Sequence, residues 1–315
     1  MFNFSMPTCI HAGDEALSRM IETAFDLAPR VLIVTDPGIV KSGLIGEIRS
    51  RLDDKGCTCS VFDQVVSNPT VENVEEAFSV LVKSESSVIV AVGGGSAMDT
   101  AKGVALLATN EGPITNYEGL ADIPNRPMPL LTVPTTVGTG AEVSNGAVLS
   151  DSSTNRKIVV ISDRMYPTGA YLDPLSVATL PPGITAATGM DALTHAIEAY
   201  VCRNSNEISD ALAISAIEII LENLLPAWRG DRESLFKMLV ASCMAGTSFL
   251  SSGLGLVHGF AMTIGGRFKV HHGEVNAVML PWVIEFNQKS SPEKFARIST
   301  AMNTKSTPAE VVRQL

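Results

Sequence analysis

The sequence predicts an α/β fold in which an N-terminal domain built on a parallel β-sheet is followed by an all-helical C-terminal domain. In the first part, short runs of β-branched residues alternate with helical patterns, as in βαβ units with right-handed crossovers. After Pro181-Pro182 the strand-like runs nearly vanish and helical periodicity takes over, as in Ser209–Leu225. We therefore expect two domains, residues 1–181 and 182–315.

Each strand of the first domain is predicted from a short apolar run that is bounded by turn residues or by a helical pattern. The run Val88–Val92 is almost wholly apolar, as expected for a parallel strand that is covered on both faces. Thr70 opens a helix with Glu72 in its first turn, where the helix dipole favours acids. The expected strands are Val31–Thr35, Cys59–Phe62, Val88–Val92, Leu130–Val133 and Ile158–Ile161.

Composition excludes several classes of protein. The net charge is −10 and no basic cluster offsets it, so nucleic acid and anionic membrane surfaces are poor partners. The five cysteines are odd in number and scattered, which indicates reduced thiols in a cytosolic protein. The N-terminus lacks a basic region followed by an apolar run, so we expect no signal peptide and a cytoplasmic location.

The run from Phe236 to Gly266 could be a transmembrane helix by composition, because its only charged side chains are Lys237 and, when protonated, His258. Glycines and hydroxyl side chains interrupt it, however. A helix buried in a bundle core therefore explains the run better than a bilayer span.

A glycine-rich segment follows the most apolar strand directly and opens a helix. Its residues are Gly93-Gly94-Gly95-Ser96. Glycine lets the backbone approach a phosphate, and the free N–H groups at a helix N-terminus stabilise the anion. The segment is neither a GxGxxG fingerprint nor a P-loop. The competing interpretation is a tight turn with no ligand.

Two other strand ends support a nucleotide site. Asp36 ends the first strand, where a carboxylate can accept hydrogen bonds from a ribose, and Thr135–Gly140 follows another strand with hydroxyls and flexible backbone. Either segment alone is compatible with ordinary turn chemistry. Together with the glycine segment they predict a dinucleotide at one edge of a Rossmann-like sheet.

A carboxylate and several histidines in the second half suggest a metal site. Asp191 and His195 are i,i+4 neighbours on one helix face, although such a pair is also typical of a salt bridge or an N-cap interaction. His258, His271 and His272 lie near glycines in apolar sequence, where a free imidazole has few partners. Three histidines and a carboxylate suit Fe²⁺ or Zn²⁺. Spacing alone does not choose between His271 and His272.

Four motifs carry a resemblance to a known family: GGGSAMDTAK, PTTVGTGAEVS, AATGMDALTHAIEAYV and GLVHGFAM…HHGEVNAVMLP. On these residues the chain resembles the iron-containing (group III) alcohol dehydrogenases, which include lactaldehyde reductase and propanediol dehydrogenase. The resemblance runs from Pro7 to the last residues. It implies a dehydroquinate synthase-like architecture with an N-terminal dinucleotide-binding domain and a C-terminal helical metal-binding domain.

The resemblance also implies the function and its residues. It implies hydride transfer between NAD(H) and a small primary alcohol, aldehyde or diol, assisted by Fe²⁺ with Zn²⁺ as the alternative, in a homodimer or higher homo-oligomer. An acid at Asp36 goes with NAD because it would repel the 2′-phosphate of NADP. The implied metal ligands are Asp191, His195, His258 and His272. The implied cofactor contacts are Asp36, Asn68, Gly94, Gly95, Ser96, Asp99, Thr135, Thr136, Thr139, Lys157 and Leu180.

The chain departs from the family pattern at two places. Many relatives carry a further histidine four residues after the equivalent of His258, where this chain has Met262. Relatives also continue beyond the position of Leu315, which leads us to expect a truncated form.

Two alternatives come from other classes. The first is a dehydroquinate synthase-like lyase that uses NAD transiently, against which the DALTHAIEAY segment argues. The second is a truncated, non-catalytic chain that acts as a binding or assembly module. The sequence does not identify the substrate.

Overall fold

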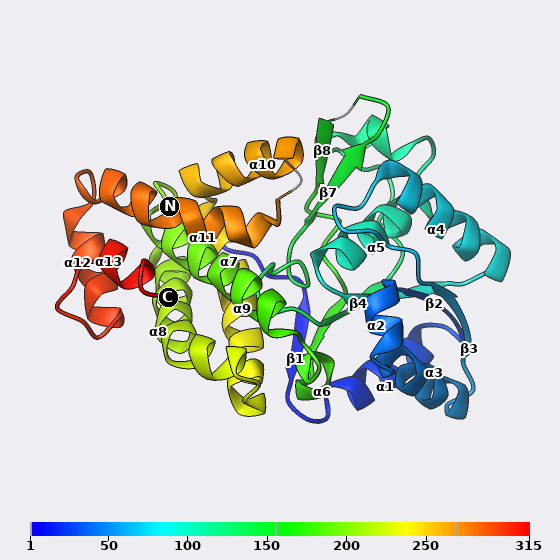
Figure 1. The fold of residues 1–315 in the computed structure, drawn as a ribbon. Helices are drawn as coiled ribbons and strands as arrows, with labels where there is room; N and C mark the ends of the chain where they lie inside the picture. The colour runs from blue at the N-terminus through cyan, green and yellow to red at the C-terminus, as the bar shows by residue number, and fades with distance from the viewer. Residues whose placement is uncertain (1, 155, 269) are drawn as a thin grey trace. The chain divides into compact units, whose positions relative to one another are not determined.

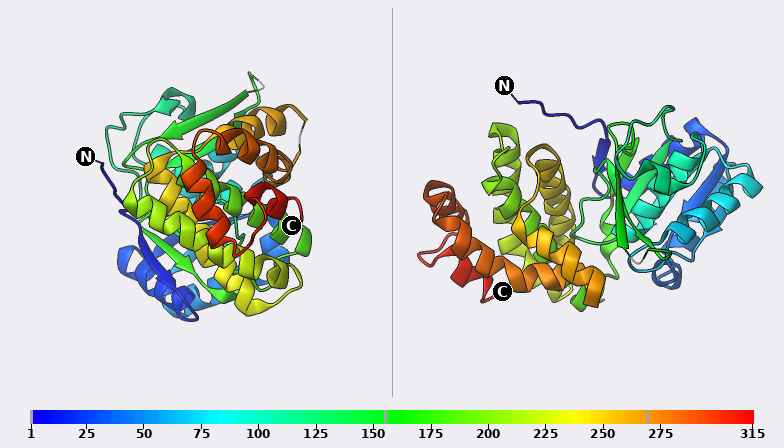
Figure 2. Two further views of the ribbon diagram at one scale, coloured as in Figure 1. Left: turned by 90° about the vertical axis from the view of Figure 1, so that its left-hand side faces the viewer. Right: turned by 90° about the horizontal axis from the view of Figure 1, so that it is seen from above.

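A computed structural model describes residues 2–154, 156–268 and 270–315 of the chain (Figure 1). The chain forms two compact units, which Figure 2 shows from two further directions. The first unit contains Pro7–Thr135 and Ala141–Thr179, and it holds all strands found in the described residues. The second is helical and contains Leu180–Leu315, the short segment Thr136–Gly140 and the N-terminal residues through Met6.

The first unit is built on a six-stranded parallel sheet in the order β1-β9-β6-β4-β2-β3. The predicted α/β class is confirmed, and four of the five expected strands lie in this sheet. Two strands of this sheet, β1 and β9, were not predicted. The bounds are β1 Cys9–Ala12, β2 Arg30–Val34, β3 Thr58–Phe62, β4 Val88–Gly93, β6 Leu130–Pro134 and β9 Gly169–Leu172.

Helices cover both faces of this sheet, which explains the continuous apolar strands. On β2, Leu32 lies in the hydrophobic cluster that includes residues of α4 (Val71–Ser84) and α5 (Gly95–Leu107). Its neighbours on the strand, Val31 and Ile33, belong to the opposite cluster with α1 (Ala16–Leu27) and α3 (Leu44–Asp54). Because successive side chains of a strand point to opposite faces, a strand covered on both sides has no polar alternation.

A separate three-stranded sheet corrects one prediction. Ile158–Ile161 was expected in the main sheet, but β8 (Arg156–Ile161) pairs antiparallel with β7 (Gly146–Asp151) and parallel with β5 (Gly119–Leu120). On β8 only Ile158 and Val160 are buried. Since the four residues Ile158–Ile161 are all aliphatic, the sequence shows no alternation of polar and apolar residues that would indicate burial on one face only.

The second unit is a helical bundle around α7, whose residues from Ala187 through Tyr200 are all buried. Small side chains such as Ala192 and Ala196 let α8, α9 and α11 pack against α7. The helices of this unit are α7 Pro182–Val201, α8 Glu207–Trp228, α9 Arg232–Ser252, α10 Leu256–Phe268, α11 His272–Gln288, α12 Pro292–Ala301 and α13 Pro308–Val312. The short helices α2 Pro37–Lys41, η1 Ile114–Tyr117 and α6 Pro174–Val177 lie in the first unit.

Helix α9 begins the apolar run from Phe236 to Gly266. Within the described residues it is the one helix that is long and apolar enough to cross a membrane. However, 61% of its 18-residue apolar stretch is buried inside the protein. Such burial is typical of a bundle helix, and α9 packs against α7 and α8. All five cysteines are free thiols.

Candidate metal centre

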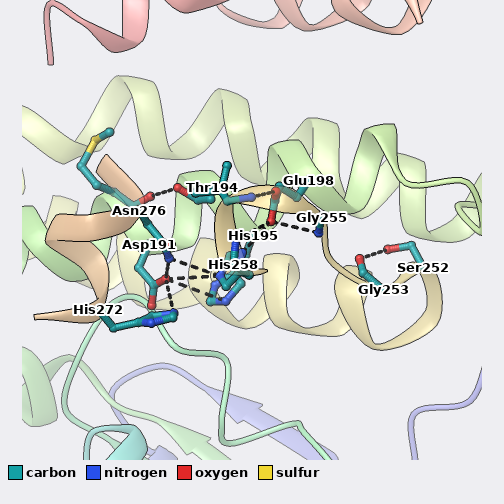
Figure 3. Close-up of polar contacts among 12 residues, drawn as sticks. Asp191, Thr194, His195, Glu198, Ser252, Gly253, Gly255, His258, His272 and Asn276 are labelled. Carbon is teal, nitrogen blue, oxygen red and sulfur yellow. Dashed lines mark hydrogen bonds and ion pairs between the residues drawn. The ribbon is translucent and has the colours of Figure 1, made fainter. Parts of the chain in front are cut away.

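Four side chains of the helical unit converge on one point (Figure 3). Asp191 and His195 are one turn apart on α7, His258 lies in the first turn of α10, and His272 is the first residue of α11. The Nε2 atoms of His195, His258 and His272 lie 3.9, 3.6 and 3.7 Å from the same Asp191 oxygen, Oδ1. The structure thus brings together the four residues predicted as metal ligands.

The spacing and chemistry of these atoms fit a divalent metal ion. Zinc bonds to imidazole nitrogen and carboxylate oxygen of about 2.1 Å, arranged tetrahedrally, separate the ligand atoms by roughly 3.4 Å. The observed separations from Asp191 Oδ1 are 3.6–3.9 Å. Asp191, His195 and His258 are all buried, and three imidazoles with one carboxylate suit Fe²⁺ or Zn²⁺.

The structure distinguishes the two adjacent histidines that spacing left open. His272 reaches the cluster, whereas His271 is exposed and occupies the N-cap position of α11. Met262, where the family pattern leads us to expect a histidine, is half-buried one turn after His258 on α10.

Two hydrogen bonds orient the imidazoles. His195 Nδ1 lies 3.0 Å from the carbonyl oxygen of Gly138, and His258 Nδ1 lies 2.6 Å from Glu198 Oε2. Both acceptors require the proton to be on Nδ1, which turns Nε2 toward Asp191. Neither Gly138 nor Glu198 was predicted from the sequence. Glu198 follows His195 by three residues on α7, a spacing that places the two on one helix face.

The charges at the centre are strongly coupled. Burial alone would raise the pKa of Asp191, but the surrounding histidines, His195 first, outweigh burial and hold it below its usual range. Burial lowers the pKa of His195 to about 4, so this imidazole is neutral at pH 7. Burial also disfavours a charged His258, yet Asp191 and Glu198 on its two sides raise its pKa to about 9. The site therefore favours a positive charge beside Asp191.

Asn276 is a further residue at the cluster that sequence reasoning missed. It is fully buried on α11, one turn after His272, and its Nδ2 donates to Asp191 Oδ1 at 2.6 Å. The same nitrogen lies 3.3 Å from His258 Nε2. Its Oδ1 has no hydrogen-bond partner within the described part of the chain. The i,i+4 spacing to His272 was the available signal, but a lone asparagine is not distinctive.

Two glycines let neighbouring segments approach α7. A Cβ on Gly138 would lie 2.4 Å from the carbonyl oxygen of Thr188, and a Cβ on Gly273 would lie 2.1 Å from that of Ala187. Because the obstructing atoms are helix backbone, they cannot move aside cheaply. These contacts fix the carbonyl that orients His195 and the start of the helix that carries His272.

In the sheet unit, the predicted nucleotide loops gather at one edge. Strands β2, β4 and β6 are parallel neighbours, so Asp36, Gly94 and Thr135, which lie one or two residues after the strand ends, emerge at the same side. A Cβ on Gly93 would lie 3.6 Å from Asp36 Oδ2. Gly94 is the N-cap of α5 and supplies no side-chain cap, which leaves backbone N–H groups for a ligand.

The other predicted cofactor residues divide between the two units. Lys157 Nζ donates to Asn68 Oδ1 at 3.2 Å. The Asp99 carboxylate accepts a hydrogen bond from the Val148 amide at 3.0 Å, which links α5 to β7. The Thr135 hydroxyl is buried without a hydrogen-bond partner in the residues the structure describes. Gly95 and Ser96 begin α5 in the sheet unit, whereas Thr136, Thr139 and Leu180 belong to the helical unit.

Comparison with known proteins identifies the family. Residues 7–174 match the family model "Iron-containing alcohol dehydrogenase", and residues 185–315 match "Fe-containing alcohol dehydrogenase family, C-terminal". The chain is 39% identical to 1,3-propanediol dehydrogenase of Citrobacter freundii over 307 residues, which cover 96% of this chain and 79% of that protein.

Solved structures agree with this assignment. The alcohol dehydrogenase from Oenococcus oeni matches with a TM-score of 0.95 and 34% identity, over 100% of this chain and 84% of that one. Sulfoacetaldehyde reductase from Bifidobacterium kashiwanohense, solved in complex with NAD⁺, matches with a TM-score of 0.93 and 27% identity, over 100% of this chain and 85% of that one. The chain therefore belongs to the iron-containing alcohol dehydrogenase family and is an oxidoreductase of that family.

Proposed function

We propose that this protein transfers a hydride between NAD(H) and a small primary alcohol, aldehyde or diol, with one Fe²⁺ or Zn²⁺ ion held by Asp191, His195, His258 and His272. The observation that carries the proposal is the convergence of three imidazole Nε2 atoms on one buried carboxylate oxygen. The relatives named above act on alcohols and aldehydes, and one was solved with NAD⁺. We further propose a cytoplasmic location and a homodimer or higher homo-oligomer.

In this mechanism, the helical unit would hold the metal and the loops of the sheet unit would bind the cofactor. A bound divalent ion supplies Lewis-acid polarisation of an alcohol or carbonyl oxygen. Asp191 remains anionic, and His195 is neutral with its Nδ1 proton directed at Gly138, so both could hold a divalent ion. NAD(H) would accept or supply the hydride, and the cofactor loops would orient its nicotinamide.

The proposed cofactor site uses the edge formed by β2, β4 and β6. The N-terminus of α5, with Gly94, Gly95 and Ser96, is suited to the pyrophosphate because its amides are uncapped. Asp36 would accept hydrogen bonds from the adenosine ribose. The remaining proposed contacts are Asn68, Asp99, Thr135, Thr136, Thr139, Lys157 and Leu180.

Metal removal tests the proposal directly. Protein stripped with a chelator is expected to lose NADH formation from a panel of small alcohols and diols, and added Fe²⁺ or Zn²⁺ should restore it. The mechanism assigns charge stabilisation in the transition state to the ion. Undiminished activity in protein shown by elemental analysis to be metal-free would contradict the proposal. A chain that binds metal but never forms NADH would favour a non-catalytic module.

The replacement Asp36→Asn tests the cofactor preference. Asp36 Oδ1 accepts from the amides of Gly38 at 2.8 Å and Ile39 at 3.2 Å, and asparagine preserves such an N-cap. The change therefore removes charge while keeping α2 in place. We expect the ratio of kcat/KM for NADP⁺ to that for NAD⁺ to rise about tenfold or more, because juxtaposed like charges cost several kcal/mol. An unchanged ratio in a variant of normal thermal stability would place the ribose elsewhere.

A further inference from the structure

Glu198 is a buried acid on α7 whose carboxylate faces only hydrogen-bond donors. Its side chain is almost inaccessible, and the residue is 2% exposed. Oε1 accepts from the Val257 amide at 2.7 Å, and Oε2 accepts from the Gly255 amide at 3.0 Å and from His258 Nδ1 at 2.6 Å. The His258 amide lies 3.4 Å from Oε2. Figure 3 shows Glu198 beside His258, on the side away from Asp191.

The Glu198 carboxylate also meets the start of α10, where it accepts hydrogen bonds only from N–H groups. Two of the amides belong to the first turn of α10, whose N–H groups have no partner within the helix. A negative charge at this end also interacts favourably with the helix dipole. Glu198 therefore fixes where α10 begins.

The same carboxylate fixes the orientation of His258. With the N–H of Nδ1 donated to Glu198, Nε2 is turned toward Asp191 Oδ1, 3.6 Å away, and a metal bound there would replace the proton on Nε2. His195 is held differently, because its Nδ1 meets the neutral carbonyl of Gly138. Of these two imidazoles, His258 alone has a carboxylate behind it, the partner that typically orients a metal-binding histidine.

The local sequence is adapted to this contact. A Cβ on Gly255 would lie 2.6 Å from Glu198 Oε1, so a side chain there would push α10 off the carboxylate. Glycine at this position lets the backbone amide approach Glu198 directly.

We propose that Glu198 is a positioning residue of the metal centre, which holds His258 in its ligand orientation and links that orientation to the start of α10. This inference rests on the proposed function, because it assumes that the four-residue cluster binds a metal. Glu198 itself contacts neither metal nor substrate and acts through His258.

The replacement Glu198→Gln isolates this role, because glutamine has the same shape but only one acceptor oxygen. Every partner of the carboxylate is a donor, so the amide NH₂ must face an N–H group whichever way it is rotated. The matched control is Asp231→Ala. Asp231 caps α9 by accepting from the Ser234 amide at 2.8 Å, so this variant loses an acidic helix cap of the same unit with no contact to the cluster.

The measurement is Zn²⁺ affinity by competition with a chelator on the full chain. We expect Glu198→Gln to bind Zn²⁺ about 10- to 100-fold more weakly than the unmodified protein, the range for removing a partner behind a metal ligand. Asp231→Ala should bind as the unmodified protein does. In a His258→Ala background, Glu198→Gln should cause no further loss, because its action passes through His258.

The outcomes separate this inference from the proposed function. If the unmodified protein binds neither Zn²⁺ nor, in the same assay without oxygen, Fe²⁺, the proposed function fails. If it binds and Glu198→Gln binds equally well, or if the same loss persists in the His258→Ala background, the positioning role is overturned. Should Glu198→Gln fail to fold, nitrogen NMR of the histidines in the Zn²⁺-loaded, unmodified protein decides the question. A proton on His258 Nδ1 with the metal on Nε2 supports the role, and the reverse assignment contradicts it.

Discussion

Replacing His258 with alanine is expected to lower kcat/KM for alcohol oxidation by about 10³-fold or more while leaving the fold intact. The Lewis acid contributes several kcal/mol of charge stabilisation in the transition state, and each 1.36 kcal/mol is a factor of ten in rate. The variant loses the Nε2 atom that lies 3.6 Å from Asp191 Oδ1. Glu198 keeps its hydrogen bonds to the amides of Gly255 and Val257, so the start of α10 should survive.

The check is steady-state kinetics together with circular dichroism on the same preparation. His271→Ala is the matched control, because His271 is exposed and directly precedes His272. Its activity should match that of the unmodified protein. Equal activity of His258→Ala and His271→Ala would remove His258 from the metal centre.

The second large effect is on stability, and it concerns Gly259 and Gly273, the glycines that directly follow His258 and His272. Gly273→Ala is expected to lower the free energy of unfolding by about 3 kcal/mol, the upper part of the range for overpacking, since its Cβ would lie 2.1 Å from the Ala187 carbonyl oxygen. Gly259 has nothing within 4 Å of its would-be Cβ and lies inside α10. Gly259→Ala should therefore raise stability by about 0.5–1 kcal/mol, the usual gain from replacing glycine within a helix.

Urea unfolding of the metal-free forms measures both changes. The two variants add the same methyl group directly after a predicted metal ligand, so they differ only in the space around it. Similar stabilities for Gly273→Ala and Gly259→Ala would mean that α11 does not approach α7 as closely as described.

Much of the sheet could be predicted because the signals are local. The apolar run Val88–Val92 predicted β4, since a strand covered on both faces has no polar alternation. β1 (Cys-Ile-His-Ala) and β9 (Gly-Ala-Tyr-Leu) contain at most one β-branched residue each, so they lack the signal that predicted the other strands. β8 was assigned to the wrong sheet because its four aliphatic residues look alike whether the partner strand is parallel or antiparallel.

The candidate site was only partly predictable, for a physical reason. Asp191 and His195 share a helix face, so their proximity follows from the helical repeat. Residue patterns gave no choice between His271 and His272, because that choice depends on how α11 enters the bundle. It was the family motif that favoured His272. The helical spacing from His195 could have indicated Glu198. Asn276 belongs to the site through its hydrogen bond to Asp191, a contact between helices that local sequence does not encode.

Metal stoichiometry of the full chain tests the central claim most directly. Equilibrium dialysis against Zn²⁺, followed by elemental analysis, should find one ion per polypeptide in the unmodified protein and far weaker retention in His258→Ala. Asp191 with its three facing imidazoles is the cluster that would account for that ion. An unmodified protein that retains no ion, or a His258→Ala variant that retains it equally well, would contradict the metal centre.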